Sequence, residues 1–186
     1  MHFTALFSLG LLANSVAAAP TRRSLSDVQA AFDKIQANIA TLVAKINAWD
    51  GQASSVQPIM DDSKKLHETI QSSATAIQGS SSIGLMDAVG VIGPVNVLST
   101  KVDDVVTALL TKKGQFDAAK VSDKVSGELV QDQAATKELI KAILGRLPSV
   151  TVSIAQPIAD GVSQKLDKAV TAYAPSGAAA APAPAS

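Results

Sequence analysis

Few side chains in this sequence could carry out chemistry. Beyond residue 19, His67 is the only histidine, and the 186 residues include no cysteine. No Gly-x-Ser-x-Gly elbow, phosphate-binding loop or dinucleotide fingerprint is present, and no histidines or cysteines have the spacing of metal ligands. His67 beside Glu68 on a helical stretch is most simply interpreted as a solvent-facing residue. The sequence therefore predicts no catalytic site, no metal site and no cofactor.

Two pairs of adjacent carboxylates, Asp61-Asp62 and Asp103-Asp104, are the remaining candidates for acid–base chemistry. Neighbouring residues on a helix do not face each other, so neither pair forms an acid–base couple. We interpret Asp61-Asp62 as favourable charge near a helix N-terminus and Asp103-Asp104 as solvated helix surface. A small hydrolase with a serine nucleophile would lack a histidine partner. We therefore expect a protein that is not an enzyme.

The composition favours a single helical domain and gives no electrostatic reason to expect a highly charged partner such as a nucleic acid. Hydrophobic residues make up 47% of the chain, aromatic residues 3%, and the formal net charge is zero. Ala, Val, Ile and Leu mixed with Lys, Asp, Gln and Ser are typical of helices rather than of a sandwich or barrel. Nucleic acids and anionic membranes bind clustered Lys or Arg. We therefore expect no nucleic-acid partner, and the sequence does not specify an oligomeric state.

The two ends of the chain differ from its middle. Residues 1–19 read as a signal peptide, with an apolar run followed by small residues. This run is too short to cross a bilayer, so we expect no transmembrane segment. Residues 174–186 form an Ala/Pro-rich tail that we expect to be disordered and that lacks the apolar run of a lipid-anchor signal. Between them, residues 20–173 form the predicted domain of a protein that is secreted, extracellular or in a cell wall.

The first predicted helix carries an uninterrupted apolar seam from residue 25 to residue 49. Ser26 has the character of its N-cap, and Asp50-Gly51 supplies the turn that ends it. Trp49, the last seam residue, is either a core side chain or an interfacial anchor. Apolar residues recur at spacings of three and four, at Leu25, Val28, Phe32, Ile35, Ile39, Leu42, Ile46 and Trp49.

Four further helices follow from the same periodicity. The third is expected to be kinked or in two parts, because Gly90, Gly93 and Pro94 interrupt it. The fourth has a polar waist at Asp132 and Thr136. Short connections containing Gly or Pro favour antiparallel neighbours, so the predicted fold is all-α, a single antiparallel bundle of about five amphipathic helices. The expected ranges of the second to fourth helices are about 58–79, 83–114 and 115–145, and the fifth follows Pro148 with apolar residues from Ile154 to Tyr173.

The apolar faces have a structural and a functional interpretation. Helical spacing of apolar residues ordinarily indicates bundle core. Taken together, however, aliphatic faces with few aromatic residues could enclose an elongated slot that holds an acyl chain. Residues 83–98 are likewise either a buried bent helix or a mobile lip that opens the core or lies on a greasy surface. The candidate ligand-binding residues are Ile35, Ile39, Leu42, Ile46, Leu66, Ile70, Leu98, Val102, Val105, Leu109, Leu129, Ile143, Val162 and Leu166.

The order of these features resembles a known family. A leader, the pair Arg22-Arg23, a long helix ending in Asn47-Ala48-Trp49-Asp50-Gly51, further amphipathic helices and an Ala/Pro tail are similar to the fungal hydrophobic surface binding protein A family. That family includes the antigenic cell-wall galactomannoproteins. The resemblance covers roughly residues 24–173 and implies a compact five-helix bundle, secreted or held in the fungal cell wall.

The resemblance also implies two roles. One branch of the family adsorbs to hydrophobic surfaces and recruits a polyester-degrading hydrolase, and another binds fatty acids in an internal apolar cavity. The leading hypothesis is therefore a secreted non-enzymatic protein that binds a fatty-acid-like lipid or a hydrophobic solid surface, with a secreted polyester hydrolase as an implied partner. The alternative is a structural cell-wall mannoprotein or antigen without a ligand. The sequence has no long Ser/Thr-rich stalk and no Asn-x-Ser/Thr acceptor, so we expect only O-linked glycans and no permanent wall attachment.

Overall fold

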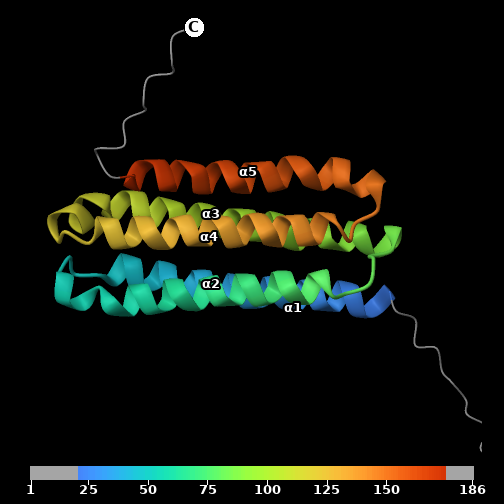
Figure 1. Ribbon diagram of the computed structural model, residues 1–186, viewed down its shortest axis with the longest axis horizontal. Coiled ribbons are helices and arrows are strands. Elements are labelled where there is room, and N and C mark those ends of the chain that lie inside the picture. Colours follow the sequence, from blue (N-terminus) through green and yellow to red (C-terminus); the bar gives the residue numbers. More distant parts are fainter. Residues whose placement is uncertain (1–20, 175–186) are drawn as a thin grey trace, which may run out of the picture.

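The computed structural model describes residues 21–174, which form five long α-helices and one short 3-10 helix without a strand among them. All five α-helices lie along the long axis of the molecule (Figure 1). The predicted all-α bundle is therefore confirmed. The predicted leader and tail lie outside the described residues, except for Ala174. The helices are α1 (Thr21–Ala48), α2 (Gln57–Gln78), α3 (Leu85–Ala118), α4 (Ser122–Leu144) and α5 (Ser149–Tyr173), and the 3-10 helix is η1 (Ala53–Ser55).

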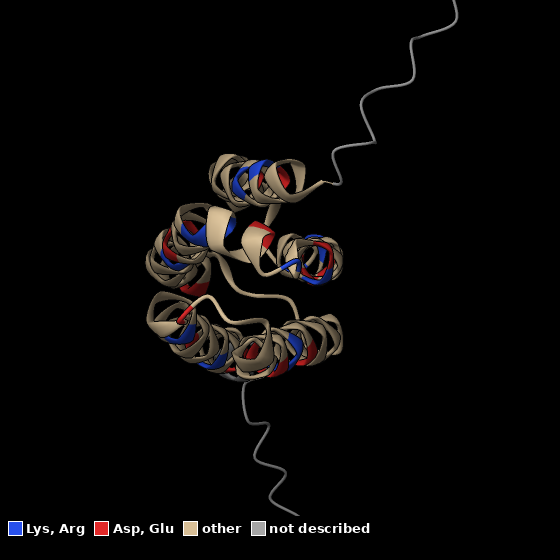
Figure 2. Ribbon diagram, turned by 90° about the vertical axis from the view of Figure 1, so that its left-hand side faces the viewer, with Lys and Arg blue, Asp and Glu red and all other residues tan. Residues whose placement is uncertain are grey.

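The helices pack in three layers (Figures 1 and 2). The pair α1 and α2 forms the first layer, α3 and α4 form the second, and α5 covers the second layer from outside. α1 packs on α3, α2 packs on α4, and α5 contacts both α3 and α4, which hardly touch each other. Acidic and basic residues are intermixed around the bundle (Figure 2). The prediction that successive helices are neighbours therefore holds for α1 with α2 and for α4 with α5, but not for α2 with α3 or for α3 with α4.

The connection after α1 closes one end of the bundle. Gly51 adopts a φ of +83°, in the region that glycine populates without steric penalty, and this allows the chain to reverse. Trp49 is buried and stacks on Phe116 with ring centroids 4.4 Å apart, while Phe116 contacts the ring of Tyr173. The tryptophan is thus a core residue, and its indole N–H donates to Gln52 O and Ser55 Oγ, both at 3.1 Å.

Two predicted helix boundaries are wrong. α1 begins at Thr21, so Ser26 lies inside the helix and is not its N-cap. α3 continues past Gly114 to Ala118, and the turn before α4 is built around Lys120, which has a φ of 58°. There Val121 N donates to Phe116 O at 3.0 Å, as in a Schellman C-cap. Because this left-handed position is occupied by lysine instead of glycine, residue type gives no signal for it.

The proline-containing helices are uninterrupted. α3 accommodates Pro94 and remains one helix over its 34 residues, so the alternative of a two-part helix is wrong. α5 accommodates Pro157 in its third turn. A proline inside a helix removes one backbone hydrogen bond. Packing of α3 on α1 and α5 holds the helix together across that gap.

Candidate ligand-binding cavity

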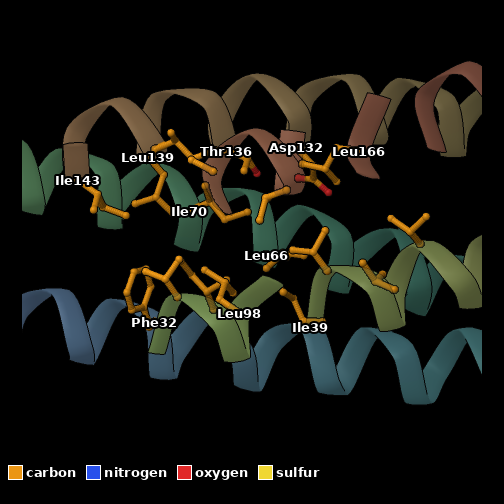
Figure 3. A pocket seen from close by; sticks show the side chains of 18 of the residues that line it. Phe32, Ile39, Leu66, Ile70, Leu98, Asp132, Thr136, Leu139, Ile143 and Leu166 are labelled. Carbon is orange, nitrogen blue, oxygen red and sulfur yellow. The ribbon is translucent and has the colours of Figure 1, made fainter. Parts of the chain in front are cut away.

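An apolar cavity lies inside the bundle, bounded by side chains from all five helices (Figure 3). Its volume is about 120 Å³. Aliphatic side chains supply nearly all of the lining, and Phe32 is its only aromatic member. The mostly aliphatic lining gives the space the character of a site for apolar groups. α5 covers the space between α3 and α4, which would otherwise leave the cavity open on that side.

All fourteen candidate residues predicted from the sequence line this cavity. The structure therefore brings the seam of α1 together with the apolar faces of α2, α3, α4 and α5. Figure 3 shows side chains from several of these helices converging on one space. They are Ile35, Ile39, Leu42 and Ile46 from α1, Leu66 and Ile70 from α2, Leu98, Val102, Val105 and Leu109 from α3, Leu129 and Ile143 from α4, and Val162 and Leu166 from α5.

Five polar residues in the lining were not among the candidates. They are Ser63, Glu128, Asp132, Thr136 and Thr151, and among the described lining residues Glu128 and Asp132 alone carry a charge. The oxygens of Asp132 and Thr136 lie among carbon side chains in Figure 3. The polar waist that interrupts the apolar face of α4 is the sequence signal for two of these residues. The polar waist belongs to a site because α2 packs on α4 and brings Ser63 close to Asp132.

Asp132 is the most buried of the charged groups in the lining, with 8% of its surface exposed. Ser63 Oγ lies 3.4 Å from Asp132 Oδ2, while Asp132 Oδ1 has no hydrogen-bond partner. Burial raises the pKa of Asp132 to about 7, the nearby Glu128 carboxylate adds to the increase, and the Ser63 hydroxyl opposes it. Around neutral pH this carboxyl group therefore exchanges between its acid and its ionised form.

His67 does not face solvent as predicted. Its side chain is only 16% exposed, and Nδ1 lies 3.5 Å from Asp132 Oδ1 without forming a hydrogen bond. His67 also lines a separate outer groove between α2 and α4, together with Glu138 and several Gln side chains. The prediction failed because α4 packs on α2 at this position and covers the imidazole. His67 and Asp132 thus separate the outer groove from the cavity.

Three carboxylates of the two adjacent pairs form separate ion pairs outside the cavity lining. Asp62 pairs with Lys45 at 2.8 Å, and Asp103 pairs with Lys165 at 2.7 Å, which ties α5 to α3. Asp104 pairs with Lys101 on its own helix at 3.2 Å. Within the described residues, no group of three or more His, Asp or Glu side chains is arranged to hold a metal ion.

Five exposed apolar side chains belong to the first turns of α3 and α5, which begin at the same end of the bundle (Figure 1). We call this group the apolar end; it consists of Leu85, Met86 and Val89 of α3 and Val150 and Ile154 of α5. Met86 is 87% exposed. The backbone joins the two starts, because Ile83 N donates to Arg146 O at 2.8 Å. This end lies next to the cavity, since Ala88 and Thr151 of the same helix starts line it.

The exposed apolar residues also make α3 unusual in composition. It is the one helix in the described part of the chain that is long and apolar enough to span a membrane by length and composition, with a mean hydropathy of 1.2. Only 17% of its most apolar stretch is buried. Because α3 packs against α1 and α5, it is an integral helix of the bundle. The segment predicted to be either a buried helix or a surface-seeking lip is therefore helical and half exposed.

The fold and the cavity together define an all-helical bundle built around an aliphatic core space. The profile of the family described as hydrophobic surface binding protein A matches residues 25–145, and the chain belongs to this family. The chain is 30% identical to cell wall mannoprotein 1 of Aspergillus flavus over 173 residues, which cover 93% of this chain and 63% of that protein. Cell wall mannoprotein 1 of Aspergillus fumigatus is 28% identical, with 93% and 60% covered. The chain thus spans about three fifths of these relatives.

Solved structures share the fold. Ligand binding domain 1 of the Penicillium marneffei MP1 protein, complexed with arachidonic acids, matches with a TM-score of 0.79 and 19% identity. The match covers 82% of this chain and 100% of that chain. AFMP4P in complex with palmitic acid matches with a TM-score of 0.77 and 17% identity over 81% of this chain and 99% of that chain. The structural neighbours bind fatty acids, and the similarity to them establishes the five-helix fold.

Proposed function

We propose that this protein is a secreted or cell-wall protein, without enzymatic activity, that binds fatty-acid-like lipids in the cavity of the bundle. The observation that carries the proposal is the cavity itself, which is lined by aliphatic side chains from all five helices. Membership of the family, the cell wall mannoprotein relatives and the fatty acids held by structural neighbours support it. The absence of charge clusters fits an apolar ligand, because burial of aliphatic surface supplies its binding energy.

The bundle must open to admit such a ligand. The cavity volume of about 120 Å³ is smaller than the roughly 300–1,000 Å³ of typical ligand pockets. α3 and α4 hardly touch, so outward movement of α5 would enlarge the space between them without breaking a direct α3–α4 interface. We place the entrance at the apolar end, where exposed side chains adjoin the cavity lining. The lipid chain would then enter along the helix axes.

A blocked cavity gives the decisive test. Val105 is buried in the lining of α3, whereas Val130 is exposed on α4 and lies outside the lining. Val105→Trp fills the space, and Val130→Trp adds the same side chain on the surface as a matched control. We expect titration with a fluorescent fatty acid to show tight binding to wild type and to Val130→Trp, and at least tenfold weaker binding to Val105→Trp.

The structural alternative makes a different prediction in the same experiment. A cell-wall protein with a completely filled core would retain no lipid, and mass spectra of the protein purified from culture medium would detect none. It would also take up neither xenon nor a fluorescent fatty acid. That outcome would disprove lipid binding. In a solid core, Val105→Trp would also destabilise the protein by about 1–3 kcal/mol through overpacking, which urea unfolding measures.

The apolar end supports a second candidate function, adsorption to hydrophobic surfaces. Monomeric proteins rarely expose large contiguous apolar patches without a binding role. Met86 and Val89 of α3 and Ile154 of α5 are all exposed at this end. A protein adsorbed through them would leave its opposite end accessible to a secreted polyester hydrolase, the partner implied by the family resemblance.

Charged substitutions at the apolar end test adsorption. We expect Met86→Asp combined with Ile154→Asp to reduce depletion of the protein onto polyester or alkane-coated particles several-fold, because both side chains are exposed at the apolar end. Val130→Asp, an equally apolar exposed position elsewhere, is the control. Equal depletion of all variants would contradict adsorption through the apolar end.

A further inference from the structure

A polar group inside the cavity has more bonding capacity than the protein uses. Asp132 projects from the middle of α4 into the lining, and its Oδ1 is buried with no hydrogen-bond partner. A carboxylate has two oxygens that accept several hydrogen bonds. Here Ser63 Oγ lies 3.4 Å from Oδ2, and His67 Nδ1 lies 3.5 Å from Oδ1 without forming a hydrogen bond. Buried polar atoms are nearly always hydrogen-bonded, so the carboxyl group of Asp132, which lines the cavity, has bonding capacity that a ligand group could use.

We propose that Asp132 is the site that receives the polar head of the bound lipid, and that it takes a carboxylic acid by sharing one proton with it. The inference rests on the proposed lipid-binding function and specifies its ligand. The hydroxyls of Ser63 and Thr136 also line the cavity near this point and offer additional donors. The lipid chain then extends from the middle of the bundle along aliphatic walls such as Leu139 and Ile143.

The charges around Asp132 explain why an acid is accepted. Glu128 on the same helix is the other charged side chain in the described lining, and its carboxylate disfavours ionisation of Asp132. From α2, His67 approaches Asp132 Oδ1 at 3.5 Å. From α5, Asp167 faces the outside of α4, where it pairs with Lys137 and accepts a hydrogen bond from Gln133. No cation of α3 or α5 is part of the described lining.

The proton balance sets the pH dependence of binding. A free fatty acid in water ionises near the ordinary carboxyl pKa, about 4.3, so it is a carboxylate at neutral pH. Below pH 7, protonated Asp132 donates its own proton to that carboxylate and no net proton is taken up. Above pH 7, both Asp132 and the fatty acid are ionised. Two adjacent carboxylates repel each other, so the complex forms only when it takes up one proton from solvent. Affinity then falls by about tenfold per pH unit.

The test compares pH profiles of binding for wild type and two variants. Dissociation constants of palmitate are measured between pH 6 and pH 9 by displacement of a fluorescent fatty acid, at lipid concentrations below aggregation. We expect wild-type affinity to be constant up to about pH 7 and to fall about 30–100-fold by pH 9. Asp132→Asn should show a flat profile and bind more tightly than wild type at pH 9, because the amide N–H donates without requiring a proton.

A second variant tests the same site without changing Asp132. Glu128→Gln removes the neighbouring negative charge, so the fall in affinity should begin at lower pH than in wild type. A fatty alcohol of the same chain length is the ligand control. Its hydroxyl donates to ionised Asp132 and accepts from protonated Asp132, so its affinity for wild type should not change with pH.

The outcomes separate this inference from the proposed function. Palmitate bound by all proteins with coincident pH profiles would overturn the head-group site while leaving lipid binding intact. An onset of weakening at the same pH in Glu128→Gln and wild type would also overturn it. No binding of palmitate or of the alcohol to wild type at any pH would disprove the lipid-binding function itself.

Discussion

Replacing Asp132 with asparagine should stabilise the lipid-free protein, and increasingly so as the pH rises. Burial holds the pKa of Asp132 at about 7, whereas the unfolded chain has the ordinary value of 3.8. The folded state therefore favours the protonated form. Stability is fully present below pH 3.8 and decreases as the pH rises toward 7, above which the loss is complete. Asparagine keeps the size of the side chain and removes this titration.

The shift of about three pKa units sets the magnitude. Each unit corresponds to about 1.36 kcal/mol, so ionisation of Asp132 destabilises the folded protein by about 4 kcal/mol above pH 7. The range from pH 5 to pH 7 covers about two of these three pKa units. The stabilisation produced by Asp132→Asn should therefore be about 2.5 kcal/mol larger at pH 8 than at pH 5.

Urea unfolding followed by circular dichroism measures this difference at both pH values. The protein must be freed of lipid first, because a bound ligand adds its own stabilisation. Asp160→Asn, which removes an exposed carboxylate from α5, is the matched control and should change stability by less than about 0.5 kcal/mol at either pH. If the advantage of Asp132→Asn is the same at pH 5 and pH 8, Asp132 is solvated, and the assignment of a buried carboxyl is refuted.

Three further changes test the fold around the cavity. Lys120→Gly should raise the free energy of unfolding by about 1 kcal/mol in urea titrations, because residue 120 has a left-handed φ of 58°; no gain would mean that the turn relaxes. Phe116→Ala should lower it by about 3–5 kcal/mol, since this fully buried ring stacks on Trp49. Gly90→Ala places the added methyl group in ordinary van der Waals contact with Leu25, at 3.8 Å, and should raise helix stability by about 0.5–1 kcal/mol. It should also slow fatty-acid uptake in stopped-flow measurements if α3 moves at the entrance, and unchanged uptake would place the entrance elsewhere.

The periodicity of the apolar residues predicted the fold because the face that an amphipathic helix buries is determined by its local sequence. The seam from Leu25 to Trp49 is complete, and its residues from Val28 onward are buried. The boundary near Gly114 was misplaced because a glycine suggests a break, whereas Gly114 stands in open space inside α3. The actual turn depends on the backbone of Lys120, and side-chain type carries little information about such a conformation.

The candidate site was partly predictable for the same reason. The apolar face of an amphipathic helix packs toward the interior, so the apolar seams of the sequence predict the aliphatic residues that line the cavity. The role of Asp132 does not follow, because a polar residue on an apolar face becomes informative only when its neighbours are known. His67 and Ser63 lie 65 and 69 positions away in the sequence and meet Asp132 only because α2 packs on α4.

Asp132 also bears on whether this bundle is a structural spacer or a binding protein. A spacer would be more stable with leucine at position 132, since a buried carboxylate at neutral pH costs several kcal/mol that an aliphatic side chain would not. The protein instead places an acid with one unpartnered oxygen against an aliphatic cavity that packing has not filled. Each feature alone destabilises the fold, and both become favourable when an apolar chain with a polar head occupies the same space. The proposed lipid binding would account for the two features together, whereas a purely structural role would explain neither.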